Sequence, residues 1–285
     1  MAQATGHIRR TFALPGRMAN RGIDSLANIG DQLAFMAKSL GDMLFATRHV
    51  GEIGRLISEI TLGSGALIVG AGTAGVIFFM AFFTGTQVGL EGFKGLQLIG
   101  AEAFTGFVSA FANTREITPL IAGVTLAAQV GAGFTAELGA MRVNEEIDAL
   151  EVMAVRPVPY LVSTRIIAAL IAITPLYLIS LFASYIATEI IVVNVLGLSA
   201  GTYAHYFGLF LPPIDVLYSL IKAMVFAITV ALIHCYYGFN ASGGPAGVGV
   251  AVGKAIRASI VAVNVINLML SSFMWGVSET VRIAG

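Results

Sequence analysis

The chain has 285 residues, of which 57% are hydrophobic and only 11% are charged. A soluble domain carries about a quarter charged residues, so this composition predicts an integral membrane protein. The formal net charge is zero, which gives no general reason to expect nucleic acid as a partner. The single cysteine, Cys235, excludes an internal disulfide and a cysteine-based metal cage.

The N-terminal region is the most polar part before the first long apolar run. Residues 1–20 contain three arginines without an apolar period, which predicts a cytoplasmic tail, and no signal peptide is recognisable there. Over residues 21–55, apolar side chains recur at helical spacing while acids and Lys38 occupy the other side. This pattern predicts an amphipathic helix with too many charges to span, lying in the membrane interface.

Five apolar stretches are long enough to cross the hydrocarbon of a bilayer as helices. They are predicted at about 62–83, 117–141, 166–195, 214–237 and 255–277, which makes the chain an all-α integral membrane protein. The stretch Ile99–Ala112 is also apolar but has only fourteen residues and contains Glu102, so a re-entrant or surface segment is predicted after the first span.

The basic residues favour this five-span arrangement with the N-terminus in the cytoplasm. Residues 1–61 supply seven lysines and arginines, the central charged block three and the last turn two. Twelve of the sixteen then lie on the cytoplasmic side, as expected for a multi-pass protein of the cell membrane. A sixth span at Ile99–Ala112 would move the central block and the last turn outside.

A dense charged block, Ala136–Arg165, lies between the second and third predicted spans. Apolar residues recur within it at helical spacing until Pro157 and Pro159, so residues 142–155 are predicted as a short amphipathic helix with an acidic face. The block is either a solvated loop or a surface for a soluble partner. Six of its charged residues fall within fifteen positions: Arg142, Glu145, Glu146, Asp148, Glu151 and Arg156.

No catalytic or metal site is predicted. Gly70–Gly75 matches the dinucleotide fingerprint only in letters, because it lies inside an apolar helix rather than between a strand and a helix. Gly247–Lys254 fails the spacing of a phosphate loop, and Ala255 replaces its Ser or Thr. The four histidines have no ligand spacing.

Charges within apolar stretches are costly and are therefore candidates for function. Glu102, Arg115 and Glu116 are the candidates for a lipid path, although Arg115 and Glu116 could instead serve as a helix end, and Lys222 could extend toward the membrane surface. A second feature is a repeat of alanines every four residues, which predicts a seam for tight helix packing. These alanines are Ala128, Ala132, Ala136 and Ala140.

The charged block and its surroundings resemble the signature of the MlaE/YrbE permeases, the membrane subunits of lipid-transporting ABC systems. The similar residues are Gly131–Gly133, Ala136–Arg142, Glu145–Met153, Pro157, Tyr160-Leu161 and Arg165. Arg115–Pro119 is similar to the family's Arg-Glu-Leu-Gly-Pro element, with Ile117-Thr118 in place of Leu-Gly, and Lys222–Val230 is similar to a further segment. Tyr237–Gly249 resembles most the actinobacterial YrbE branch, and within it the "B"-type subunit.

The resemblance implies a permease domain over residues 56–285 and a transporter with several other subunits. These are a second YrbE-type permease, a cytoplasmic ATPase dimer that holds ATP and Mg, and MCE-domain proteins on the outer face. Arg142, Glu145, Glu146, Asp148 and Glu151 would then form the coupling helix, and the cargo would be a hydrophobic lipid such as a fatty acid, a mycolic acid or a sterol. A secondary transporter, or a scaffold that anchors MCE proteins without ATP coupling, remains the alternative.

Overall fold

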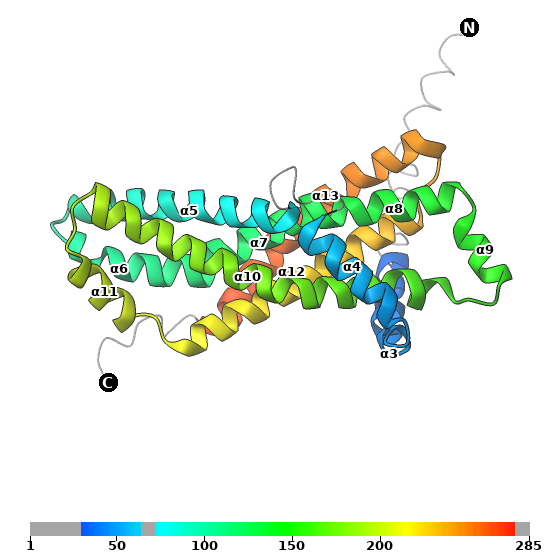
Figure 1. Ribbon diagram of the computed structural model, residues 1–285, viewed down its shortest axis with the longest axis horizontal. Coiled ribbons are helices and arrows are strands. Elements are labelled where there is room, and N and C mark those ends of the chain that lie inside the picture. Colours follow the sequence, from blue (N-terminus) through cyan, green and yellow to red (C-terminus); the bar gives the residue numbers. More distant parts are fainter. Residues whose placement is uncertain (1–29, 64–71, 277–285) are drawn as a thin grey trace, which may run out of the picture.

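The computed structural model describes residues 30–63 and 72–276, and these residues are entirely helical or in turns. Long helices run beside one another along the longest axis, with α9 at one end and α11 at the other (Figure 1). The elements are a helix at residues 30–41, α3 (Met43–Ala46), α4 (Val50–Leu62), α5 (Gly72–Gln97), a continuous helix Glu102–Val143, α9 (Glu146–Val152), a continuous helix Val158–Val195, α11 (Ala200–Leu209), α12 (Pro213–Phe239) and α13 (Gly244–Trp275).

Within the described residues, five helices are long and apolar enough to cross a membrane. They are α5, Glu102–Val143, Val158–Val195, α12 and α13, so the predicted all-α fold with five spans is confirmed. The predicted tail at 1–20 and the segment at 64–71 that opens the first predicted span lie outside the described residues.

The first span covers a different stretch from the one predicted at 62–83. α5 continues to Gln97, through a glycine-rich stretch beyond the predicted end of the span. The reason is a close approach to the third span: a Cβ on Gly85 would lie 2.4 Å from the carbonyl oxygen of Ser184, and the Thr188 hydroxyl donates to the Gly85 carbonyl at 2.8 Å. These glycines serve helix contact rather than a loop.

We expect Gly85→Ala to destabilise the protein by about 1–3 kcal/mol, because the added methyl group forces α5 away from the third span. Gly95→Ala on the same helix is the control, since nothing lies within 4 Å of its added Cβ. Detergent-based unfolding titrations would measure both variants. Equal stability of the two variants would contradict the close contact.

The predicted re-entrant or surface segment at Ile99–Ala112 is wrong. A short turn follows α5, and from Glu102 the chain is helical without interruption to Val143. The helix passes through two π-helical segments, η2 (Ser109–Ile117) and η3 (Ala127–Gly131), between the α-helical parts α6 (Thr105–Val108), α7 (Thr118–Leu126) and α8 (Ala132–Val143). The length count failed because it ended the segment at the polar residues 113–116, although these residues continue the helix and pair with neighbouring helices.

The third span likewise begins earlier than predicted, in the π-helical segment η4 (Val158–Ser163), and continues through α10 (Thr164–Glu189) and η5 (Ile190–Val195). α12 agrees closely with the prediction. α13 begins at Gly244, eleven residues before the predicted start of the fifth span at about 255. The predicted interfacial helix at 21–55 is divided within its described part into the helix at 30–41, α3 and the first half of α4.

The core lies where the second, third and fourth spans meet. Leu126, Ile173 and Phe226 are fully buried there. A row of polar contacts also joins the second and third spans: Thr118 and Ser184 hydroxyls lie 3.0 Å apart, and Asn113 donates to Thr188 at 3.0 Å. Polar groups paired in this way hold helices together where water is absent.

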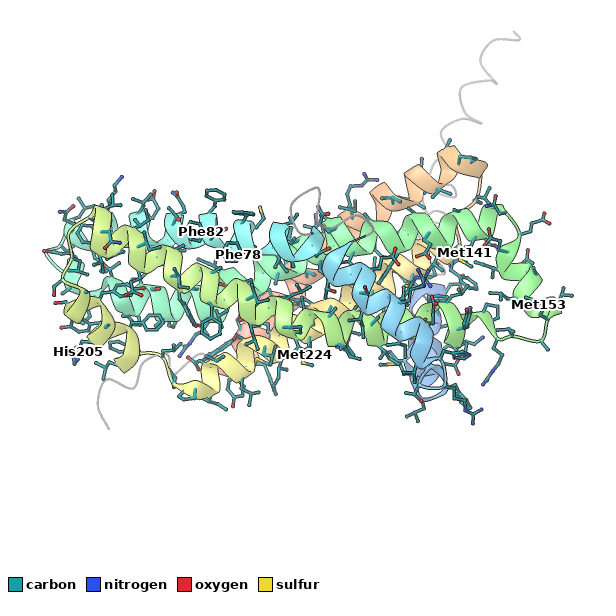
Figure 2. All side chains as sticks on the ribbon, in the orientation of Figure 1. Phe78, Phe82, Met141, Met153, His205 and Met224 are labelled. Carbon is teal, nitrogen blue, oxygen red and sulfur yellow. The ribbon has the colours of Figure 1, made fainter. Side chains whose placement is uncertain are left out.

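The two ends of the molecule differ in character. Figure 2 shows Met153 at the tip of the α9 end and His205 at the α11 end, with Phe78 and Phe82 along α5 between them. α13 contributes only four residues, spaced four apart, to the buried interior: Ala251, Ala255, Ser259 and Val263. Most of its surface therefore faces away from the rest of the chain.

Candidate functional site

The first candidate site is a cluster of charged side chains that lies where α12 begins and α13 ends. Arg115 lies in the π-helical segment η2, a wide helical form that is frequent at functional sites. Its guanidinium forms an ion pair of 2.8 Å with Asp215 and lies 4.5 Å from the centre of the Phe111 ring. Trp275 at the end of α13 also donates to Asp215, at 2.9 Å.

Asp215 owes its position to the start of α12. The pair Pro212-Pro213 begins this helix, and Asp215 lies in its first turn, where free N–H groups favour an anion. Both partners of the ion pair are largely withdrawn from the surface, with side-chain exposures of 12% for Arg115 and 7% for Asp215. The pair links the second and fourth spans.

Lys222 forms the second half of the cluster. Its ammonium is fully buried and donates to the Arg115 carbonyl at 2.6 Å, to Ser271 at 2.6 Å and to Glu116 at 3.2 Å. Pro119 has no N–H with which to bond the Arg115 carbonyl four residues earlier, so the lysine supplies a donor that the helix lacks. Lys222 therefore points into the protein, and the predicted extension toward the membrane surface is wrong.

Glu116 is the accessible member of the cluster. It accepts from Lys222, from Asn267 at 2.8 Å and from Ser271, yet 40% of its side chain is exposed. Buried atoms without a partner in the described structure lie on the same residues: one terminal nitrogen of Arg115 and the amide oxygen of Asn267. The cluster is neutral as a whole, and it has spare hydrogen-bonding capacity for the polar head of an amphipathic molecule.

The structure thus brings together two of the three predicted lipid-path residues, Arg115 and Glu116. Glu102 does not join them: it begins the helix thirteen residues earlier, about 20 Å away along the axis. The sequence reading missed Asp215, Asn267, Ser271 and Trp275. Only Asp215 had a signal, an acid two residues after Pro213 at the start of a span.

The second candidate site is α9 and its flanks. α8 ends at Val143, and a short turn containing Glu145 in the left-handed region (φ 60°) reverses the chain into α9. Ile147 is buried and anchors α9, while Glu146, Asp148 and Glu151 are exposed. Arg142 forms an ion pair with Asp148 across the turn. The predicted acidic helix is present, though shorter than 142–155.

The α9 helix also presents apolar side chains at its far end. Val152 is 89% exposed and Met153 is 64% exposed, beside the acidic residues. Such a surface, acidic with two exposed apolar side chains, is suited to a groove on a soluble protein. The surrounding chain turns sharply again at Ala154, whose φ is 58°.

Behind α9, a charge network ties three helices together. Arg165 is 1% exposed, pairs with Glu137 at 2.7 Å and donates to the Leu161 carbonyl at 2.7 Å. Arg55 of α4 reaches Glu137 at 3.7 Å, so α4, α8 and α10 share one network. The second and third spans are therefore held together just where α9 connects them.

At the edge of this network, Arg55 pairs with Glu52 at 2.7 Å. Hydrogen bonds from Arg55 hold the pKa of Glu52 below its usual value, against the opposing effect of burial. The pair stabilises α4 at neutral pH, and this contribution is lost as the pH falls through the lowered pKa. Its size is small because the arginine is half exposed.

The predicted packing seam faces outward within the chain. Ala128, Ala136 and Ala140 are exposed and Ala132 is half-buried, so the seam does not pack against the described helices of this chain. Tight packing of the seam against another subunit stays a prediction. The opposite face packs instead: a Cβ on Gly131 would lie 2.5 Å from the His234 ring, and one on Gly139 2.8 Å from Val248. Spacing alone could not tell these two faces apart.

In the described part of the chain, no group of three or more His, Cys, Asp or Glu side chains is placed to hold a metal ion.

Comparison with known proteins agrees with this architecture. The family model described as "Permease MlaE" matches residues 63–273. A "probable ABC transporter permease protein" of Rickettsia felis is 31% identical over 256 residues, which cover 89% of this chain and 99% of that protein. A protein of Synechocystis with the same description is 30% identical over 214 residues, 75% of this chain and 81% of that protein.

A plant protein is similar over a shorter part of its own length. "Protein TRIGALACTOSYLDIACYLGLYCEROL 1, chloroplastic" of Arabidopsis thaliana is 30% identical over 206 residues, 72% of this chain and 59% of that protein. The region that the family model matches, residues 63–273, contains Arg115, Glu116, Asp215 and Lys222 as well as α9. The chain therefore belongs to the MlaE permease family and is a multi-pass, non-catalytic transmembrane subunit of an ABC transporter.

Proposed function

We propose that this subunit forms, with a second permease, the membrane path of an ATP-driven MCE-type importer of hydrophobic lipid. The observation that supports the cargo is the cluster around Glu116: it offers a polar anchor within apolar helices, as an amphipathic lipid requires. The Arabidopsis relative is named after a glycolipid, trigalactosyldiacylglycerol, and this name also favours a lipid cargo. Fatty acids, mycolic acids and sterols are the proposed classes.

In this proposal α9 is the coupling helix, on the cytoplasmic side together with the N-terminus. Its acidic face would dock into a cytoplasmic ATPase dimer, which holds the ATP and Mg. The buried Arg165–Glu137 pair would pass the ATPase movement to the second and third spans, because it joins them directly behind α9. MCE-domain proteins would bind at the α11 end, on the outer face of the cell membrane.

The coupling role is tested by reversing two charges, Glu145→Lys with Asp148→Lys. We expect at least a tenfold loss of ATPase recovery when the variant is purified in mild detergent, since both residues are exposed and Ile147 still anchors α9. Glu91→Lys, an exposed acid at the far end of α5, is the matched control. Unchanged ATPase recovery in the double variant would refute the coupling role.

The same purification separates the proposed transporter from its alternatives. Recovery of an ATPase, a second permease and MCE proteins would support the complete assembly. A chain that elutes without an ATPase under mild cross-linking would favour a secondary transporter or a scaffold for MCE proteins.

We further propose that the second permease covers the outward face of the second span. This face contains the alanine seam and the exposed Gln129, a combination of small and polar residues that favours helix association in lipid. Tyr237–Gly249 is the basis for a finer proposal, that the chain is an actinobacterial YrbE "B"-type subunit paired with an "A"-type one.

Ala136→Leu tests this interface without disturbing the chain's own packing, because Ala136 is exposed. We expect the second permease to dissociate more readily, by about 1–3 kcal/mol of association free energy from overpacking. Val76→Leu on the exposed side of α5 is the control. If subunit recovery is the same for both variants, the seam faces lipid.

A further inference from the structure

We propose that the corner between α3 and the chain before the third span is a binding site for the headgroup of an anionic phospholipid, with Arg48 and Arg156 as its two cationic groups. Both guanidinium groups lie against one ring, that of Phe45, at 5.8 Å for Arg48 and 4.5 Å for Arg156. The two arginines come from segments more than a hundred residues apart, and the fold brings them together.

The corner lies at the level where the third span begins. α3 packs against η4, the first segment of that span, and Arg156 comes two residues before it. The preceding helix at 30–41 is fixed to the same place, because the Ser163 hydroxyl donates to the Ser39 carbonyl at 2.8 Å. Residues at the end of a span lie at the depth of lipid headgroups.

The apolar side chains around the arginines indicate a lipid rather than water or a soluble protein. Leu44 is 82% exposed, Val50 is 71% exposed and Phe45 is 41% exposed, although none of the three belongs to a membrane-spanning helix. Exposed apolar residues beside arginines on a short interfacial helix are typical of a surface that binds anionic lipid, the acyl chains covering the apolar groups.

The two guanidinium groups are available for a ligand. Among the described residues, neither Arg48 nor Arg156 lies within 4.0 Å of a carboxylate, and both are exposed. At the same corner, His49 packs edge-on against Tyr160 and keeps one buried ring nitrogen without a hydrogen-bond partner. Two arginines and a histidine supply the donors that a phosphate group accepts.

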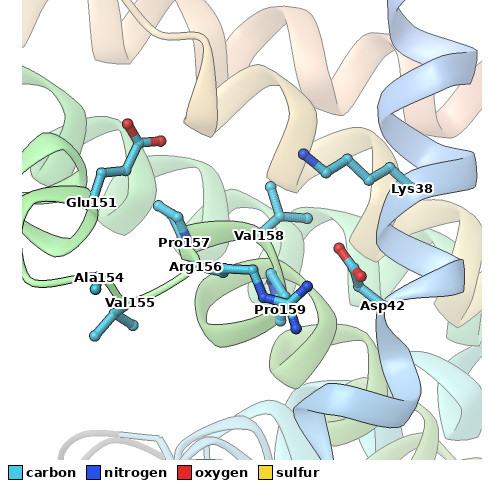
Figure 3. A pocket seen from close by; sticks show the side chains of 9 residues that line it. All are labelled: Lys38, Asp42, Glu151, Ala154, Val155, Arg156, Pro157, Val158 and Pro159. Carbon is cyan, nitrogen blue, oxygen red and sulfur yellow. The ribbon is translucent and has the colours of Figure 1, made fainter.

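A pocket of about 490 Å³ lies at this corner, and Arg156 is one of the residues that line it (Figure 3). Lys38, Asp42 and Glu151 line it together with Arg156 and the segment Pro157–Pro159. Its two acids offset Lys38 and Arg156, so the pocket itself has no excess of positive charge. The excess positive charge of the corner comes from Arg48. The phosphate is therefore expected near the Phe45 ring, between Arg48 and Arg156. The pocket is then left for the uncharged part of the headgroup.

The site would make the coupling region sensitive to the lipid around it. Arg156 lies four residues after Val152, the last residue of α9, and α3 leads directly into α4, whose Arg55 joins the network behind α9. A bound headgroup would therefore fix both segments that flank α9. The inference needs only the membrane placement of this chain and not its proposed partners.

The test is a lipid titration of the purified full chain in neutral detergent, with bound lipid counted by native mass spectrometry. We expect dioctanoyl phosphatidylglycerol to bind and dioctanoyl phosphatidylcholine to bind at least tenfold more weakly. Arg48→Gln with Arg156→Gln should weaken phosphatidylglycerol binding about tenfold or more, and Arg48→Lys with Arg156→Lys should restore part of it. Inorganic phosphate alone should give no thermal stabilisation, because it cannot cover the apolar side chains.

Lys94→Gln with Arg257→Gln is the control, since both residues are exposed bases away from this corner. Equal loss of binding in the control pair would mean general charge attraction and would overturn the site. Equal binding of the two lipids would also overturn it. If the glutamine pair kept its phosphatidylglycerol but lost the ATPase in a pull-down, the corner would be a protein-docking surface instead.

Discussion

Asp215→Ala is expected to destabilise the protein by about 3–5 kcal/mol, because it leaves the Arg115 guanidinium without its partner inside the protein. Trp275 would lose its acceptor in the same step. The free energy of unfolding, measured by denaturant titration in detergent, is the direct readout. Lipid binding at the cluster should be lost as well. Lys222 donates to the Arg115 carbonyl, so a shift of Arg115 also disturbs Lys222.

A second variant separates the charge effect from a general failure to fold. Arg115→Met combined with Asp215→Leu removes both charges and keeps apolar volume, which in other buried pairs is nearly neutral. We expect this double variant to recover most of the lost stability but not the lipid binding. A double variant as unstable as Asp215→Ala would show that the pair is not the source of the effect.

Arg165→Ala is expected to destabilise the protein by about 2–4 kcal/mol. The side chain is almost fully buried, so its removal takes away the pair with Glu137, the bond to the Leu161 carbonyl and the packing on Phe134. The effect is smaller than for Asp215, because Glu137 is 38% exposed and keeps Arg55 nearby. Arg257→Ala, an exposed arginine on α13, should change stability by less than about 0.5 kcal/mol.

The Arg165→Ala variant also tests whether Arg165 positions α9 or contacts the ATPase itself. Arg165 lies behind α9 rather than on its surface, so Arg165→Ala should still recover the ATPase in a pull-down, while Glu145→Lys with Asp148→Lys should not. A loss of ATPase recovery by Arg165→Ala at temperatures where it stays folded would contradict this division of roles.

Taken alone, the sequence determined the membrane class, the five spans and the acidic helix between the second and third of them. These follow from local properties: apolar runs long enough for a bilayer, and charges that lipid excludes. Arg115 and Glu116 were recognisable as candidate functional residues, because charged residues within an apolar stretch are costly in lipid. The resemblance to the MlaE/YrbE permeases rests on the long motif around α9, and the family model confirms the MlaE permease family.

Only the tertiary structure decided what the polar residues inside the spans do. Asn113, Arg115 and Glu116 read as the end of an apolar segment, yet they lie within a continuous helix because partners on α10, α12 and α13 satisfy them. The predicted first span ends before Gly85, because the sequence does not show the Ser184 backbone that Gly85 approaches. In both cases the deciding group is distant in the chain, and a polar or glycine residue inside a membrane is stable only beside the partner that the fold supplies.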